Sequence, residues 1–343
     1  MRTALALLTL AGLLLACSRP PELVQHHLAV FGTEVSITLP ADQDSGPAVA
    51  RVDRELQRMH RDWHAWEPGQ LVQINQAIAA GRCADLPEDV AAVIKRAGEL
   101  ERRSRGLFNP AIGRLLELWG FHASELPRGP PPAEADIADL VSRAPSMRQL
   151  HIRDGRLCSD NRAVQLDFGG YIKGVAVERA LKLLAESGLE HAIVNAGGDL
   201  GVIGRRGRRS WQAAVQHPDG HSGHHAAVLE VHDGEFVFTS GNYRRYRQGA
   251  GIRHGHIIDP RDGYPADAVS SVSLIAEDGG LADAAATALA VAGNGEWREI
   301  AAALGIDRVM RIKADGSVEL TPQMAARVQW RERPNRIKRI STR

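Results

Sequence analysis

The sequence predicts one α+β domain, in which mixed sheets are packed against helices. Segments with strand-like alternation and segments with helical periodicity are interspersed, but they do not form the regular strand–helix–strand series of a parallel α/β sheet. The chain has 343 residues, of which 44% are hydrophobic, and this is enough for a sizeable core. Its 34 glycines indicate many loops between the elements.

The first half of the chain favours helices. They follow a strand-like stretch, "HLAVFGTEVSITLP", in which apolar and polar residues alternate. Glu88 and Asp89 come directly after Pro87, and acidic side chains are favourable in the first turn of a helix. The prolines of "LPRGPPPAEADIADLV" predict an exposed insert or a stiff connector before another short helix. The three longer helices are expected at 47–66, 87–105 and 110–119.

The second half of the chain favours strands. Asp154-Gly155 separates two alternating runs and predicts a hairpin. Residues 174–187 are expected to form a helix between the strands, and the Ala-rich segment 281–292 another. Strands are expected at 191–196 and 269–276, with 211–216 and 226–240 forming a β ribbon.

The charge balance gives no general attraction for nucleic acid. Lys and Arg number 42 and Asp and Glu number 41, which leaves a formal net charge of +1. Such a chain has no strong field of one sign that would attract a polyanion. The aromatic content is only 5%. The chain also lacks the alternating aromatic and basic residues that bind single-stranded nucleic acid by stacking on its bases. We therefore expect no nucleic-acid partner.

Residues 1–17, "MRTALALLTLAGLLLAC", predict a signal peptide. The apolar run is too short for a typical membrane span of about 20 residues. It ends in "LLLAC", which resembles the bacterial lipobox, so Cys17 is expected to carry lipid and to begin the mature protein. The alternative is a plain secretory signal with an incidental cysteine. The lipobox implies a lipid anchor on the periplasmic side of a bacterial membrane, and Ser18 resembles the residue of lipoproteins sent to the outer membrane.

Two cysteines remain after Cys17, and the last residues are strongly basic. Cys83 and Cys158 could pair in an oxidising compartment, but the sequence gives no distance between them, and we favour separate buried thiols. Residues 18–325 are expected to form the domain. The basic tail 326–343 is expected to be a frayed, solvated terminus rather than a contact with an anionic membrane.

Two segments could hold an anionic ligand and a cation. Asp283 and Thr287 are four residues apart in the Ala-rich helix, so both oxygens project from one face and suit Mg²⁺. A first-turn Asp and a Thr bonded to its own helix explain the pair equally well. "LDFGGYIKG" places Asp167 at a strand end and Lys173 beside glycines at a helix start, where a phosphate could bind. A strand–turn–helix joint with a solvated lysine is the alternative there.

"GHIIDPRDGYP" is a rigid segment that carries His256. Its prolines fix their own φ and Gly263 permits a reversal, but a turn alone needs no histidine. The sequence contains no P-loop, no H-E-x-x-H, no paired C-x-x-C and no G-x-G-x-x-G that opens a helix after a strand. These common enzyme classes are therefore disfavoured.

Taken together and in order, these segments resemble the ApbE family, the FAD:protein FMN transferases. The resemblance runs from "FGTEVSITL" to the Ala-rich helix and covers most of the mature chain. It implies a single T-fold-related domain. The motifs that carry it are "GLFNPAIGRLLELWGF", "DFGGYIKGVAVERA", "VNAGGDLGVIG", "FTSGNYRRY", "HIIDPRDGYP" and "DAAATAL".

The resemblance implies a Mg²⁺-dependent transfer of the FMN part of FAD to a Thr or Ser hydroxyl of a partner flavoprotein, through a phosphoester bond and with release of AMP. It implies that His256 is the catalytic base. The acceptor would be a flavoprotein subunit of a membrane redox complex. The implied metal site comprises Asp283 and Thr287 with main-chain oxygens near Gly170 and Ala286, and the implied FAD contacts are Phe31, Leu107, Phe108, Asn109, Asp167, Lys173 and Ile257.

Two alternatives remain open within this resemblance. One is a pyrophosphatase that hydrolyses FAD to FMN and AMP, and the other is a non-catalytic periplasmic lipoprotein that binds flavin. Asn109 and Asn242 stand where many relatives have Asp, which keeps size and hydrogen-bonding capacity but removes a negative charge. These exchanges affect at most the affinity for FAD or metal. Tyr243 and the arginines beside it either line the site or belong to an edge strand.

Overall fold

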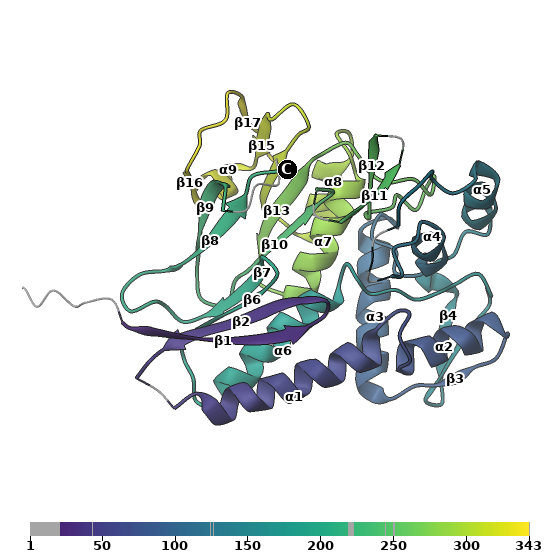
Figure 1. The fold of residues 1–343 in the computed structure, drawn as a ribbon, viewed down its shortest axis with the longest axis horizontal. Helices are drawn as coiled ribbons and strands as arrows, with labels where there is room; N and C mark the ends of the chain where they lie inside the picture. Colours follow the sequence, from purple (N-terminus) through teal and green to yellow (C-terminus); the bar gives the residue numbers. More distant parts are fainter. Residues whose placement is uncertain are drawn as a thin grey trace, which may run out of the picture.

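The described part of the chain is built on one nine-stranded sheet (Figure 1). The computed structural model describes residues 21–342 except 43, 124, 126, 219–222, 244 and 250, so Cys17 and the predicted signal peptide lie outside it. Adjacent strands are antiparallel except the last pair, which confirms the α+β class. The order across the sheet is β1 (Leu23–Val30), β2 (Thr33–Pro40), β6 (Ala192–Ala196), β7 (Asp199–Ile203), β10 (Phe236–Gly241), β13 (Ser271–Ala276), β14 (Arg308–Ile312), β15 (Val318–Leu320) and β17 (Ile337–Arg339).

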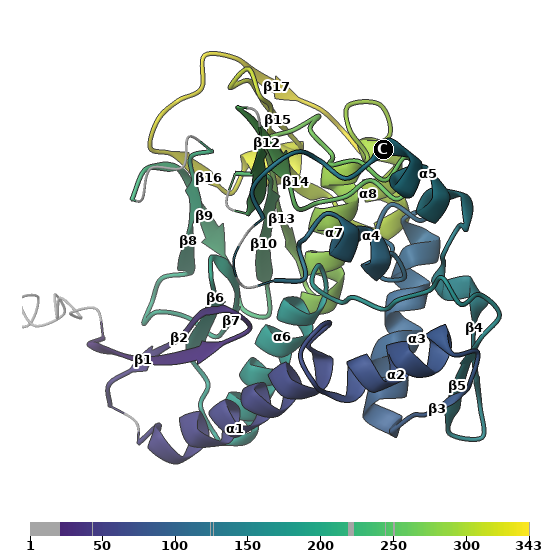
Figure 2. The same cartoon turned by 45° about the vertical axis from the view of Figure 1, so that its right-hand side comes forward.

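Helices cover one face of this sheet and bury the larger core with it (Figures 1 and 2). The Ala-rich helix α7 (Gly279–Val291) packs on β10 and β13, because its small side chains allow a close approach. Helix α6 (Ile172–Glu186) lies between α7 and α1 (Gly46–Trp63). The helices predicted at 174–187 and 281–292 are therefore confirmed as α6 and α7. Helices α3 (Glu88–Arg103) and α8 (Trp297–Leu304) pack farther out, against α7.

A small sheet with the order β16–β9–β8 covers the opposite face and closes a second core. Its strands are β8 (Trp211–Gln216), β9 (His225–Val231) and β16 (Val328–Trp330). The predicted strand 226–240 is therefore two strands in two sheets: β9 ends at Val231, and β10 enters the large sheet at Phe236.

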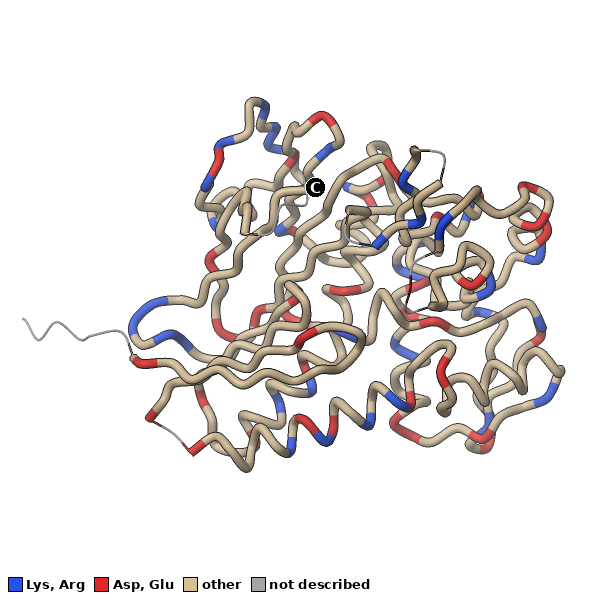
Figure 3. The backbone as a smooth tube through the Cα atoms, viewed as in Figure 1, with Lys and Arg blue, Asp and Glu red and all other residues tan. Residues whose placement is uncertain are grey.

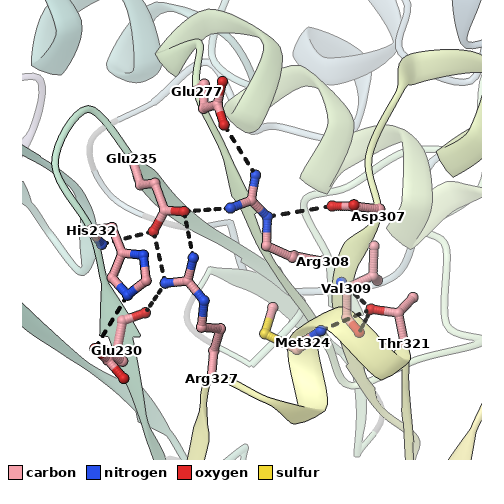
Figure 4. A network of polar contacts seen from close by, with 10 residues as sticks. All are labelled: Glu230, His232, Glu235, Glu277, Asp307, Arg308, Val309, Thr321, Met324 and Arg327. Atoms are coloured by element: carbon pink, nitrogen blue, oxygen red, sulfur yellow. Dashed lines mark hydrogen bonds and ion pairs between the residues drawn. The ribbon is translucent and has the colours of Figure 1, made fainter.

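Glu235, in the turn between β9 and β10, forms ion pairs with two arginines of the C-terminal part of the chain (Figure 4). The carboxylate is only 4% exposed and accepts hydrogen bonds from Arg308 on β14 and from Arg327 just before β16. The Arg327 Nη2–Glu235 Oε1 distance is 2.8 Å. Separating Glu235 from the two arginines would leave an unpaired buried charge, which is costly. The contact therefore holds the turn, β14 and the start of β16 together.

The expectation of a frayed tail is wrong. Within 326–343, β16 pairs with β9 and β17 pairs in parallel with β15, and Val328, Trp330 and Ile337 pack against the second core. Backbone pairing and these apolar contacts together order the segment. The short helix α9 (Pro322–Ala325) leads into this region. Its first turn is capped by the Thr321 hydroxyl, which accepts from the Met324 N–H at 3.3 Å.

Most of the remaining elements form a helical layer and a three-stranded sheet at one side (Figure 1), while β11 (Tyr246–Gly249) and β12 (Ile252–Gly255) form a separate two-stranded sheet. Asp154-Gly155 joins β4 to β5 with positive φ values of 49° and 69°, as a two-residue hairpin turn requires, and confirms that prediction. Cys83 and Cys158 form a disulfide, with a Cα–Cα distance of 4.3 Å, so the preference for separate thiols is wrong. The elements are α2 (Gln70–Ala79), β3 (Ala84–Asp85), α4 (Gly113–Leu118), α5 (Glu134–Ser142), the 3₁₀ turn Met147–Gln149, β4 (Leu150–Arg153) and β5 (Arg156–Ser159).

Acidic and basic residues are intermingled along the helices and loops, as Figure 3 shows for α1. A more basic stretch lies around β16 and β17, where Arg331, Arg333, Arg336, Lys338 and Arg339 follow one another closely.

Among the described residues, none of the helices combines the length and apolar character that a membrane crossing requires.

Candidate functional site

A cavity of about 650 Å³ lies where the loops of the sheet meet α1, α6 and α7. It brings together segments from most of the chain and falls within the size range of small-molecule sites. Ala286 is buried within α7 at 1% exposure and does not line the cavity, so a contribution through its main-chain oxygen stays a prediction. The predicted site residues that line the cavity are Phe31, Leu107, Phe108, Asn109, Asp167, Gly170, Lys173, His256, Ile257, Asp283 and Thr287.

Close contact between the first turns of α6 and α7 forms the polar end of the cavity. A Cβ atom on Gly174 would lie 2.0 Å from the carbonyl oxygen of Gly279, so only glycine permits this approach. The Gly174 N–H donates to Asp283 Oδ2 at 3.1 Å. A Cβ atom on Gly170 would lie 2.7 Å from Thr287 Oγ1, which places the Gly170 backbone beside that hydroxyl. Asp283 and Thr287 therefore both line the cavity beside the start of α6, and their joint binding of a cation stays a prediction.

Lys173 lies between two carboxylates at this end. Its ammonium group pairs with Asp199 and lies 4.0 Å from Asp283 Oδ1. Asp199 Oδ1 also accepts the Thr239 N–H at 2.9 Å. Burial raises the pKa of Asp283 to about 6, and Asp199 adds to the effect, although Lys173 opposes it. A desolvated carboxylate that one ammonium group only partly compensates is a suitable ligand for a further cation.

Asp167 is held in its ionised form on another wall. Burial alone would raise its pKa, but hydrogen bonds from His122 Nε2 at 2.8 Å and from the Gly169 N–H at 2.7 Å lower the pKa below its usual value. The His122 ring stacks on Trp66 with centroids 5.1 Å apart, and the Arg245 guanidinium lies 5.8 Å from the Trp66 ring centroid. An aromatic surface and an anion thus lie side by side.

Among the hydrogen bonds of the described residues, the His256 ring takes part through Nδ1 alone. Nδ1 lies 3.1 Å from the Arg245 carbonyl oxygen, and because a carbonyl only accepts, Nδ1 carries the proton and Nε2 has the lone pair. Burial lowers the pKa of His256 to about 4, and the positive charge of Arg245 contributes. The imidazole is therefore neutral at pH 7 and can accept a proton at Nε2.

Hydrogen bonds hold the turn that follows His256. Asp259 Oδ1 accepts the backbone N–H of Arg261 at 2.9 Å, and the Arg261 guanidinium donates to both carboxylate oxygens of Asp259. Trp119 Nε1 donates to the Gly263 carbonyl at 2.8 Å, and Gly263 has φ +78°. Asp259 therefore stabilises the turn, and His256 is the residue of this segment that offers a proton acceptor to the cavity.

Phe31 occupies a strained position at the cavity wall. It forms the turn between β1 and β2 together with Gly32, and its φ of +56° is unfavourable for a bulky side chain. Backbone strain of this kind persists when the surrounding structure holds the residue in place for another purpose.

The two asparagines that depart from the ApbE pattern have structural partners. Asn109 donates to the Pro145 carbonyl at 2.9 Å and accepts the Ala111 N–H at 2.9 Å. Asn242 donates to the Ala266 carbonyl. Both amides donate hydrogen bonds that a carboxylate could not. Tyr243 and Arg245 line the cavity, as one of the two alternatives for this segment predicted.

Several lining residues were not among the sequence predictions, and three of them carry polar or aromatic groups that the site uses: Trp66, His122 and Asp199. Asp199 lies within "NAGGDLG", a segment that the sequence marked as unusual without identifying its functional residue. Trp66 lies in the polar segment "HAWEPG" just after a helix, where a large aromatic residue is a weak signal of a binding surface. His122 has no local signal, because its partners Asp167 and Trp66 are distant in the sequence.

The profile of the ApbE family matches residues 31–310. The chain belongs to the ApbE family. It is 42% identical over 336 residues to a FAD:protein FMN transferase of Rhodobacter capsulatus, covering 96% of this chain and 63% of that protein. It is 34% identical over 221 residues to one of Treponema pallidum, covering 59% of each chain. The crystal structure of the ApbE protein from Thermotoga maritima superposes with a TM-score of 0.80 at 28% identity, covering 89% of this chain and 99% of that one.

The chain spans less than two thirds of the length of these Rhodobacter and Treponema relatives. The Thermotoga structure, by contrast, is matched over nearly its whole length. The ApbE fold therefore accounts for most of the described residues, including every segment that lines the cavity.

The contact between α6 and α7 predicts a strong requirement for glycine at position 174. Gly174→Ala should lower the free energy of unfolding by roughly 1–3 kcal/mol, because the new methyl group meets backbone that cannot rotate away. Gly295→Ala is the matched control, since no atom lies within 4 Å of the added Cβ and φ is not positive there. Urea unfolding of both variants measures the difference, and equal stability of the two would contradict the packing argument.

Proposed function

We propose that this chain transfers the FMN part of FAD to a Thr or Ser hydroxyl of a partner flavoprotein, forming a phosphoester bond and releasing AMP. The observation that carries the proposal is the presence, in one cavity, of a neutral His256 whose Nε2 carries the lone pair and of the charged group formed by Lys173, Asp199 and Asp283. The names of the relatives, FAD:protein FMN transferase, support the same reaction.

The reaction needs one proton transfer and one displacement at phosphorus. His256 Nε2 takes the proton of the acceptor hydroxyl, whose oxygen then attacks the phosphorus of the FMN half. The bond from that phosphorus to the bridging pyrophosphate oxygen breaks, and AMP leaves with the electron pair. A hydroxyl is barely ionised near pH 7, so a positioned base contributes about 10²–10⁴-fold to the rate. The Nδ1–H bond to the Arg245 carbonyl keeps Nε2 in the form that can act.

The charged end of the cavity suits the pyrophosphate. Lys173 can approach phosphate oxygens, on which negative charge gathers during phosphoryl transfer, and the helix start behind it favours an anion. Asp283 and Thr287, with the Gly170 backbone beside them, would hold Mg²⁺, since a partly compensated buried carboxylate and a hydroxyl are oxygen ligands. When bound, Mg²⁺ supplies positive charge that stabilises the transferred group and the leaving phosphate.

The remaining walls suit the two ring systems of FAD. Trp66, stacked on His122, offers an aromatic face, while Phe31, Leu107 and Phe108 add apolar surface. The ionised Asp167 accepts hydrogen bonds beside that face. Rings bind by stacking and apolar burial, whereas the phosphates require charge. The cavity therefore offers aromatic and apolar walls for the rings of a dinucleotide and a charged end for its phosphates.

We further propose that the chain works outside the cytoplasm, anchored by lipid on Cys17 at the periplasmic side of a bacterial membrane. Two features support this location: the apolar run that ends in "LLLAC" and the Cys83–Cys158 disulfide, since disulfides persist in oxidising compartments. An acceptor flavoprotein subunit of a membrane redox complex would be reachable from there.

His256→Asn should separate substrate binding from chemistry. The amide can still donate to the Arg245 carbonyl, as Nδ1–H does, but it has no basic nitrogen in place of Nε2. We expect FAD affinity to remain within a few-fold of the wild type and transfer to fall about 10²-fold or more. The measurements are FAD titration and the flavin fluorescence retained by denatured acceptor.

His254→Asn is the matched control, because His254 lies two residues earlier and does not line the cavity. Wild-type transfer by His256→Asn would exclude His256 as the base. If the wild type releases FMN and AMP in the presence of acceptor without labelling it, the chain is a pyrophosphatase and not a transferase.

Mg²⁺ binding should weaken as the pH falls below about 6. In the metal-free protein Asp283 is ionised above its pKa of about 6 and protonated below it, so a proton then competes with the cation. The apparent dissociation constant should rise about tenfold for each pH unit below 6. Calorimetric titration between pH 5 and pH 7.5 tests this.

Thr287→Val should bind Mg²⁺ more weakly but keep the same pH dependence, because it removes only a neutral ligand. Asp283→Asn should bind no Mg²⁺ at any of these pH values. A Mg²⁺ affinity that is constant from pH 5 to pH 7 would show that another group holds the ion.

Cys17 should become labelled when cells are fed a fatty acid that can be detected chemically. The label should be absent from Cys17→Ser, and that variant should leave the membrane fraction because the lipid is its anchor. An unlabelled, freely soluble wild type would refute the lipid anchor.

A further inference from the structure

Three side chains that commonly bind metals gather at the end of α1, and the proposed reaction uses none of them. His60 lies in the last turn of the helix, His64 is the residue that ends it, and Glu67 follows in the loop. One possible ligand atom from each of these residues lies within 4.8 Å of the other two. All three residues line the cavity, as does Trp66, which lies between His64 and Glu67 in the sequence.

Helix geometry explains why the two imidazoles meet. Residues four apart project from the same side of a helix, and the chain turns into an extended conformation at His64. The ring centroids of His60 and His64 are 5.2 Å apart. His64 Nε2 lies 3.6 Å from Glu67 Oε1. The three ligand atoms are therefore close enough for one ion to be bound after a local adjustment of this segment.

His60 contacts other rings at this end of α1. Within the described part of the chain its ring contacts the rings of Phe31, at 5.6 Å, and His64, and it makes no hydrogen bond or ion pair. A half-buried imidazole in that position retains a ring nitrogen that can bind an ion. Glu67, by contrast, is exposed and can move toward one.

We propose that His60, His64 and Glu67 bind one divalent transition-metal ion of the Zn²⁺ class. Two imidazoles and one carboxylate form the ligand set of open zinc sites, in which water takes the fourth position. Imidazole nitrogens favour Zn²⁺, Cu²⁺ or Ni²⁺ over Mg²⁺, which takes oxygen ligands. The site is therefore distinct in chemistry from the group around Asp283, and it does not depend on the proposed function.

Binding requires one local rearrangement. His64 Nδ1 accepts the Glu67 N–H at 3.0 Å, so in the metal-free ring the proton is on Nε2. An ion at Nε2 moves that proton to Nδ1 and replaces the hydrogen bond to the Glu67 backbone, with no net release of protons from His64. The loop between His64 and Glu67 then has to shift, and it carries Trp66. The Trp66 ring contacts the rings of His64, at 4.3 Å, and His122, at 5.1 Å. Metal binding should therefore alter the emission of Trp66.

The test uses untagged protein, freed of metal with a chelator and titrated calorimetrically with ZnCl₂ in buffer that contains Mg²⁺. We expect one equivalent to bind to the wild type. His60→Ala and His64→Ala should each weaken binding by about tenfold or more, since each removes one of three ligands. Co²⁺ in place of Zn²⁺ should give the visible absorption of a nitrogen-ligated ion in the wild type and not in these variants.

Two controls separate this site from others. His232→Ala removes an exposed histidine that also pairs with a glutamate, Glu230, and Asp283→Asn disables the proposed Mg²⁺ site. Both should bind Zn²⁺ as the wild type does, and circular dichroism verifies that all variants are folded. No binding by the wild type, equal binding by the His60 and His64 variants, or loss of binding in either control would overturn the proposal. A Zn²⁺-dependent change in fluorescence that persists in Trp66→Phe would contradict the predicted loop movement.

Discussion

The contact between Gly174 and Gly279 is the constraint on which the arrangement of the cavity depends. Because neither residue has a side chain, the backbones of α6 and α7 approach closely enough for a Gly174 N–H to reach Asp283. Lys173 precedes that glycine, so the same contact sets its distance from Asp283. The charged end of the cavity therefore follows from backbone packing, and the sheet behind it supplies a fixed support through β10 and β13.

Burial in this cavity has opposite effects on two groups and makes each more useful. It raises the pKa of Asp283, which leaves a carboxylate that a cation stabilises, and it lowers the pKa of His256, which keeps the imidazole neutral. Water would weaken both effects. The apolar residues of the cavity therefore contribute to its chemistry even where they touch no charged group, because they exclude the solvent that would restore ordinary pKa values.

The sequence predicted the local parts of this structure better than the long-range ones. Motifs such as "HIIDPRDGYP" specify a turn through their own residues, so the turn that carries His256 could be predicted without knowledge of its neighbours. The disulfide depends on the pairing of β3 with β5, which sets Ala84 opposite Leu157, and no local pattern reveals that register. The split of 226–240 into two sheets and the ordering of the basic tail also depend on partners distant in the chain. The same holds for His122, whose role comes from Asp167 and Trp66.

The Cys83–Cys158 bond spans 75 positions, and the closed segment contributes Leu107, Phe108, Asn109 and His122 to the cavity. Closing such a loop removes conformations from the unfolded chain and so favours the arrangement of this wall. A chain with reduced thiols must hold the same wall by packing alone. Among the described residues, those that line the cavity include no sulfur atom. The redox state of the compartment nevertheless affects how firmly this wall of the cavity is held, because it decides whether the disulfide forms.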